Sequence, residues 1–185
     1  MDAPGTFGYS SGMELLSGKA AANHISGILH PKYQLHGSSV HLTVRKISSI
    51  DPIGQVDFGG GEYIAAGRIE LAPRQMRPED KYLWWDLERS GYYIECNEAL
   101  HLAADEIALI EPEDRLLRAG GSHAPLIARG HVEPVELLIE VIAGRLRVKQ
   151  NARIARVRVF RIAGTKTTRA RKNNSKNHEP ARKKK

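Results

Sequence analysis

The sequence is poor in cysteine and contains no long hydrophobic run. Cys96 is the only cysteine among 185 residues, which excludes an internal disulfide and a zinc site built from paired thiolates. No window approaches the roughly 18 apolar residues of a membrane-spanning helix. The first dozen residues also lack the basic-then-apolar order of a secretory signal. We therefore expect a cytoplasmic protein without membrane contact.

Excess basic charge is absent from most of the chain, although the formal net charge is +7. Residues 165–185 hold nine Lys and Arg against one acid, Glu179, which leaves 19 basic and 20 acidic residues for 1–164. The body is thus nearly neutral. The tail is polar, rich in asparagine and too poor in apolar surface to fold, so it is predicted to be disordered. It could bind phosphate or nucleic acid non-specifically, or merely keep the protein soluble.

The length and the 41% share of hydrophobic residues suit a single folded domain. We assign residues 1–13 to a flexible N-terminus, 14–164 to the domain and 165–185 to the basic tail. Near the start of the domain, Ser17 can cap a short helix over residues 18–25, which Gly27 would end.

Short alternating stretches predict that the rest of the domain is mainly β. Residues 40–45 alternate apolar and polar side chains, and residues 135–142 give the clearest pattern, with one purely apolar face. Trp84 and Trp85 are expected to precede a strand. Many short strands with glycine-bearing turns predict an antiparallel sandwich or barrel. The further predicted strands cover residues 63–71, 92–95, 99–103, 106–110, 145–149 and 152–162.

The order of these segments resembles that of the dCTP deaminase and dUTPase superfamily. Residues 16–31 and 37–44 are similar to the opening helix of dCTP deaminases and its following Pro-Ala-Ser-x-Asp-Leu-x-Leu strand. Residues 93–109 resemble the stretch that leads into a Thr-x-Glu strand. Residues 121–130 resemble the Arg-Ser-Ser-x-Ala-Arg-x-Gly phosphate segment. Finally, residues 137–140 and 150–155 resemble the catalytic and closing strands, so the similarity spans roughly residues 14–162.

This resemblance implies a dUTPase-like distorted β-barrel or jelly-roll with a short N-terminal helix, assembled as a homotrimer with active sites between subunits. The implied ligand is a deoxynucleoside triphosphate with Mg²⁺ paired to the triphosphate. The implied reaction is deamination of dCTP to dUTP, hydrolysis of dUTP to dUMP and pyrophosphate, or both. Zinc-dependent base deaminases use a Pro-Cys-x-x-Cys type motif. A deaminase with a lone Cys96 would therefore have to work without zinc.

Specific residues follow from the same resemblance. Glu140 matches the catalytic glutamate, which acts as general acid and base toward water. Ser122, His123 and Arg129 fall on the phosphate segment, and His41 replaces the aspartate of the first strand as a ligand-binding candidate. Taken by themselves, Glu140 could equally be a solvated strand residue, and His41 could lie on the surface.

Departures from the family pattern keep other functions open. No arginine precedes Ser122, Pro125 interrupts the segment, and Arg129 follows Ser122 by seven positions rather than four. The chain could therefore be a nucleotide-binding or structural relative without turnover. A nucleic-acid binder that acts through residues 165–185 is the third interpretation.

Overall fold

The computed structural model describes residues 12–51 and 53–162, and these residues form a mainly β fold as predicted. The predicted basic tail and most of the predicted N-terminal segment lie outside the described residues. Within the described chain, no helix is long and apolar enough to cross a membrane.

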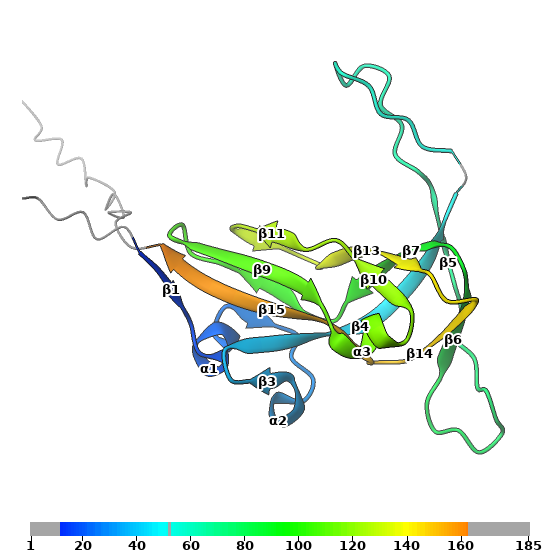
Figure 1. Cartoon of the computed structure of the whole chain (residues 1–185), viewed down its shortest axis with the longest axis horizontal. Coiled ribbons are helices and arrows are strands. Elements are labelled where there is room, and N and C mark those ends of the chain that lie inside the picture. Colours follow the sequence, from blue (N-terminus) through cyan, green and yellow to red (C-terminus); the bar gives the residue numbers. More distant parts are fainter. Residues whose placement is uncertain (1–11, 52, 163–185) are drawn as a thin grey trace, which may run out of the picture.

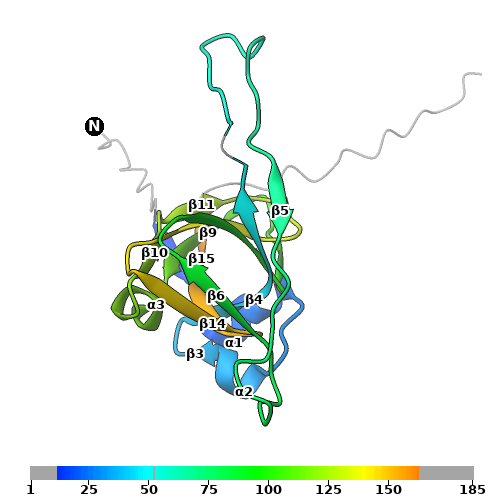
Figure 2. The same cartoon turned by 90° about the vertical axis from the view of Figure 1, so that its right-hand side faces the viewer.

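One large antiparallel sheet makes up most of the body and curls into a half-barrel (Figure 1, Figure 2). Its strands are β1 (Met13–Leu15), β3 (Leu35–His36), β4 (Ser39–Ile50), β5 (Arg68–Glu70), β7 (Gly91–Cys96), β9 (Glu106–Pro112), β10 (Gly121–His123), β11 (Leu126–Ala128), β13 (Glu136–Val141) and β15 (Arg153–Ile162). The main path runs β10-β13-β7-β4-β15-β9-β11, while β1 pairs with β15, and β3 and β5 pair with β4.

Smaller elements complete the fold. A second sheet has the order β12-β8-β2, formed by His131–Val132, Ala99–His101 and Ile25–Ser26, and β6 (Trp84–Glu88) pairs with β14 (Arg145–Lys149). The helices are α1 (Gly18–Ala22), α2 (Pro31–Gln34) and α3 (Asp114–Arg118). Because α3 contacts β10 and β15, it covers the sheet beside residues 121–130, the stretch that resembles the family's phosphate segment.

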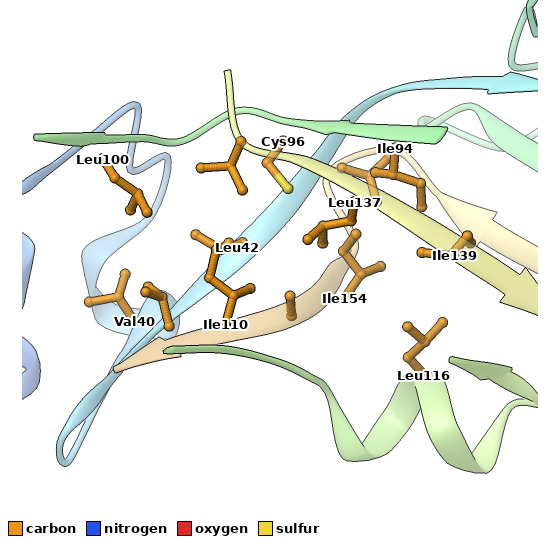
Figure 3. Close-up of a cluster of buried hydrophobic side chains, with 14 of the residues drawn as sticks. Val40, Leu42, Ile94, Cys96, Leu100, Ile110, Leu116, Leu137, Ile139 and Ile154 are labelled. Carbon is orange, nitrogen blue, oxygen red and sulfur yellow. The ribbon is translucent and has the colours of Figure 1, made fainter. Parts of the chain in front are cut away.

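The core forms where the apolar faces of the curled sheet meet. On β13 the predicted alternation is confirmed, since Leu137, Ile139 and Val141 are buried while the residues between them are exposed. Figure 3 shows side chains of this core in one cluster with Leu42 of β4 and Leu116 of α3. Full burial of such a side chain contributes about 1.5–3 kcal/mol. This packing fixes which face of β13 is left for other roles.

A buried carboxylate that the sequence analysis did not single out ties three segments together. Glu98 is fully buried between β7 and β8. Its Oε1 accepts hydrogen bonds from Gln34 Nε2 and the Thr43 hydroxyl, both at 2.6 Å, and its Oε2 accepts one from the Thr43 N–H at 2.8 Å. Burial raises the pKa of Glu98, although these hydrogen bonds act in the opposite direction. The cluster anchors β4 to α2.

The predicted first helix is correct in its start and too long at its end. Ser17 Oγ accepts a hydrogen bond from the Ala20 N–H at 3.3 Å, as expected of a cap. The helix stops at Ala22, because Ile25 pairs with Leu100 in β8 instead. Tertiary pairing therefore overrides the helical preference of the alanines.

One strand prediction is incomplete and another is too long. Trp84 and Trp85 do precede a strand, β7, but they also lie on a strand of their own, β6, which the sequence analysis did not predict. Of the predicted strand 63–71, only Arg68–Glu70 joins the sheet. The segment before it belongs to an arm between β4 and β5 that projects from the body (Figure 1, Figure 2). Its side chains lack a sheet to cover them, so Val56 and Phe58 are exposed.

Candidate functional site

Two candidate residues from separate segments meet on neighbouring strands. Glu140 of β13 lies directly opposite Ser122 of β10 and is flanked on its other side by Gly91 of β7. Directly opposed residues of antiparallel strands share a face, with Cβ atoms about 5 Å apart. The register therefore brings the carboxylate and the hydroxyl together, a relation that their positions in the sequence do not reveal.

A pocket of about 510 Å³ opens at this place. That volume lies within the roughly 300–1,000 Å³ typical of small-molecule sites. Among the described residues that line it, Glu140 is the only acidic side chain and no Lys or Arg is present. We call this space the Glu140 pocket, and it is lined by Ile50, Gly91, Ser122, His123, Ala124, Leu138, Ile139 and Glu140.

His123 follows Ser122 on β10 and is among the residues that line the Glu140 pocket. Its ring is buried, and Nδ1 lies 2.8 Å from the carbonyl oxygen of Ala124. Since a carbonyl only accepts, Nδ1 carries the proton. Burial lowers the pKa of His123, so the ring is neutral at pH 7 and Nε2 is an unprotonated acceptor. That atom is buried and has no hydrogen-bond partner among the described residues.

Glu140 itself is exposed, as its position opposite the apolar face predicts. Its side chain has no hydrogen bond or ion pair with any described residue, whereas Glu136, four positions earlier on the same face, pairs with Arg68. Glu140 lies between two exposed apolar side chains, Leu138 at 51% and Ile142 at 57% exposure. A carboxylate that has no partner among the described residues and lies between exposed apolar side chains suits a site that another molecule covers.

The other two candidates lie outside the Glu140 pocket. Arg129 is exposed after the end of β11 and does not line the pocket. His41 lies on β4, whose far end supplies Ile50 to the pocket. Ile50 lies nine positions after His41 on the strand, a distance of roughly 30 Å at about 3.3 Å per residue. Of the five candidates, the structure therefore groups Ser122, His123 and Glu140.

His41 has a structural environment instead. Its side chain is 12% exposed, and its Nδ1 contacts the carboxylate of Glu113. Burial, followed by the positive charge of Arg153 and weaker contributions from other nearby cationic groups, lowers the pKa of His41 to about 4. His41 is therefore neutral at pH 7, and its Nδ1–H donates to Glu113.

Gly121 stands where the family's phosphate segment has an arginine, and neighbouring side chains pack closely against it. A Cβ at Gly121 would lie 2.6 Å from Cδ1 of Leu116 in α3 and 3.0 Å from Cδ2 of Leu146. The helix thus occupies the space into which a side chain at this position would extend. Ser122 and His123 follow without a guanidinium before them.

Sequence reasoning missed the apolar part of the Glu140 pocket. Ile50 and Gly91 lie at the ends of two strands that pair through Ser49 and Tyr92. A side chain at Gly91 would meet Cδ1 of Ile50 at 3.1 Å, so the glycine leaves room at the pocket wall. No local pattern marks either residue. Within the described chain, no group of three or more His, Cys, Asp and Glu side chains could hold a metal ion.

No family model matches the chain. A curated relative, named "Probable deoxyuridine 5'-triphosphate nucleotidohydrolase" of Methanosarcina acetivorans, is 24% identical over 133 residues, which cover 70% of this chain and 73% of the relative. The 2'-deoxycytidine 5'-triphosphate deaminase of Agrobacterium tumefaciens superposes with a TM-score of 0.58 at 16% identity, over 80% of this chain.

The chain matches about half of that deaminase, 49% of its length. A dUTPase of Staphylococcus bacteriophage 80alpha gives a TM-score of 0.38 at 11% identity, over 58% of this chain and 85% of that one, too low to support a conclusion. The deaminase establishes the fold, and the similarity to the Methanosarcina relative agrees with the resemblance found in the sequence. The chain is a distant relative of the dCTP deaminase and dUTPase superfamily.

Proposed function

We propose that the chain binds a deoxynucleoside triphosphate in the Glu140 pocket and acts on it. The observation that carries this proposal is the opposition of Glu140 and Ser122 across β10 and β13. The superfamily relationship and the names of the two relatives, a dUTP nucleotidohydrolase and a dCTP deaminase, support the choice of substrate class.

Glu140 would serve as general acid and base without zinc. In deamination it takes a proton from water as the oxygen attacks C4 of cytosine, and a proton is then passed to the departing ammonia. In dUTP hydrolysis the same carboxylate can activate water toward phosphorus. Mg²⁺ would enter with the triphosphate, whose oxygens supply most of its ligands, and one nearby carboxylate suits such a site.

A homotrimer would complete the Glu140 pocket. A triphosphate needs cations, and the described residues that line this pocket in the single chain include none. Leu138 and Ile142 flank Glu140 with exposed apolar surface that a neighbouring subunit could cover. A partner's basic side chains would then reach the phosphates.

Light scattering tests this assembly. We expect a mass three times the 20.5 kDa of the chain, and Leu138→Asp should lower it. Leu117→Asp, on the exposed side of α3, is the matched control and should leave the mass unchanged. A monomeric wild type would contradict the shared site.

A relative that binds nucleotide without turnover is the second candidate. Gly121 favours it, because this position supplies no guanidinium to a phosphate and Leu116 packs where a Cβ there would lie. The two candidates differ in one measurement. The protein is incubated with each deoxynucleoside triphosphate and Mg²⁺, and the products are resolved by chromatography. Formation of dUTP or dUMP supports an enzyme, whereas binding without product supports the second candidate.

A further inference from the structure

A second pocket, separate from Glu140, is lined by residues of α3, β14 and the start of β15. Figure 1 and Figure 2 show α3 and β14 on the same side of the body. This pocket has a volume of about 490 Å³ and is here called the basic pocket. Among the described residues, four cationic side chains line it and no acidic one does: Arg115 of α3, Arg147 and Lys149 of β14, and Arg153 of β15. Such a lining selects an anion.

These cations are only partly neutralised by the protein. The Arg115 side chain has no hydrogen bond or ion pair with a described residue. Arg153 Nη1 donates to the carbonyl oxygen of Tyr33 at 2.7 Å, which leaves its charge uncompensated. Arg147 Nε lies 3.7 Å from Oδ1 of Asp86, an acid that Arg147 shares with two other arginines. Excess positive charge therefore remains at the pocket.

The electrostatic effect of this charge is visible at a neighbouring group. The positive charges of Arg153 and Arg115 act on His41 and, after burial, help to keep its ring neutral by lowering its pKa. An anion in the basic pocket would offset the effect of Arg153 and Arg115 and raise the pKa of His41. The positive charge of the pocket therefore acts on a group outside its lining.

The remaining lining suits a ring. Tyr82 lines the pocket with its ring 4.1 Å from Lys149 Nζ, and the side chain of Tyr82 is half exposed. Apolar side chains form the floor, among them Leu146, Val148 and Ile154. Aromatic and apolar surface beside cations is a combination that can bind a flat ring and a phosphate on one molecule.

We propose that the basic pocket binds a phosphorylated small molecule that carries an aromatic ring, of the class of the mononucleotides. Arg115 and Arg153 would hold the phosphate, and the ring would lie against Tyr82. This site is independent of the proposed reaction, because none of its described lining residues lines the Glu140 pocket.

Calorimetric titration of the full chain with three probes tests the proposal: AMP, adenosine and inorganic phosphate. Adenosine has the ring without the phosphate, and inorganic phosphate has the charge without the ring. AMP should bind at least about tenfold more tightly than either. Arg115→Gln should weaken AMP binding about tenfold, as expected for loss of a charge-assisted hydrogen bond.

Arg118→Gln is the matched control, since Arg118 lies on the same helix outside the basic pocket. It leaves the same tail and the same net charge as Arg115→Gln, and it should leave AMP binding unchanged. Glu140→Gln should also leave AMP binding unchanged, so failure of the proposed reaction cannot be mistaken for failure of this site. Tyr82→Ala should reduce the affinity for AMP toward that for inorganic phosphate.

Three results would each overturn the proposal. The first is that AMP binds no more tightly than inorganic phosphate. The second is that Arg118→Gln weakens AMP binding as much as Arg115→Gln. The third is that a single-stranded oligonucleotide displaces AMP from both variants equally well. Each of them would identify a diffuse basic surface rather than a built site. Both variants change exposed positions, and equal melting temperatures confirm that they fold.

Discussion

The Glu140 pocket has a carboxylate and no cation among its described lining residues, whereas the basic pocket has four cations and no carboxylate. The two differ because of where their residues come from. The first lies where β10, β13 and β7 run side by side, and the second where α3 meets β14 and the start of β15.

Under the proposed function, the difference would separate the proton acceptor from the cations that bind phosphate within one chain. A deoxynucleoside triphosphate needs both, so the Glu140 pocket would depend on a neighbouring subunit or on Mg²⁺ for positive charge. The basic pocket can hold an anion but has no group among its described lining residues that would activate water. Variants that change one pocket and spare the other can therefore test the separation.

The largest effect is expected from Glu140→Gln. This change keeps the shape of the side chain but removes the proton acceptor, so turnover should fall about a hundredfold to ten-thousandfold. Nucleotide binding and the melting temperature should stay close to wild type. The measurement is the initial rate on the best deoxynucleoside triphosphate.

Glu136→Gln is the control for this experiment, because Glu136 shares the face of β13 but pairs with Arg68 outside the Glu140 pocket. It should keep activity within a few-fold of wild type. If both variants lost activity equally, the loss would reflect removal of any negative charge from β13. Such a result would contradict the role of Glu140 as the proton acceptor.

The second-largest effect is expected on stability, from the loss of the Glu98 carboxylate that ties β4 to α2. Glu98→Ala would leave the N–H and the hydroxyl of Thr43 without their acceptor inside the protein, and each such group costs about 1–3 kcal/mol. Gln34 would lose one of the two acceptors of its Nε2 and keep the carbonyl oxygen of His41. We expect a loss of at least about 3 kcal/mol in the free energy of unfolding, measured by urea denaturation. Glu95→Ala, which removes a partly exposed partner of Arg45, should cost much less.

A smaller effect is expected on the pKa of His41, which responds to the positive charge of the basic pocket. The pKa of His41 is about 4, below the ordinary 6.5, so the unfolded chain binds the proton more readily between these values. Stability from this group is present above pH 6.5 and is lost as the pH falls toward 4, by at most about 3 kcal/mol. In an NMR titration, Arg153→Gln should raise the pKa of His41. Glu140→Gln should leave it unchanged, and a shift there would couple the two pockets.

The smallest effect on stability is expected from deleting residues 165–185. This segment has no apolar side chain larger than alanine apart from one proline, so its removal should leave the melting temperature almost unchanged. Any binding to DNA or RNA should disappear, because the body has almost no net charge, and the basic pocket alone offers far fewer cations than the tail to release phosphate counterions. Retained nucleic-acid binding at the same salt concentration would point to the basic pocket or another surface of the body.

The fold was predictable where local pattern and tertiary environment agree. The alternation over residues 135–142 predicts β13 and the outward position of Glu140, and Ser17 predicts the start of α1. The arm was not predictable from residues 63–71, because their apolar composition resembles that of a strand. Whether a partner strand exists depends on the path of the chain elsewhere.

The site was predictable in its residues more than in its geometry. Glu140 and Ser122 came from a resemblance, but their opposition depends on the register between β10 and β13, which no local pattern encodes. His41 looked like a surface residue or a ligand group, and its burial beside Glu113 depends on α3, a helix the sequence did not reveal. The basic residues of 145–149 were visible, but Arg115 joins them only through folding.

The arm between β4 and β5 should be a place where the chain tolerates cleavage and the insertion of foreign sequence. Among the described residues, its two sides are joined beyond Asp51 and Gly67 mainly by two hydrogen bonds between Gln55 and Ile64. Amide protons there should exchange far sooner than those of the curled sheet. A protease should therefore cut near Gly60 without unfolding the curled sheet. A foreign peptide or a whole reporter domain could be inserted at the same place.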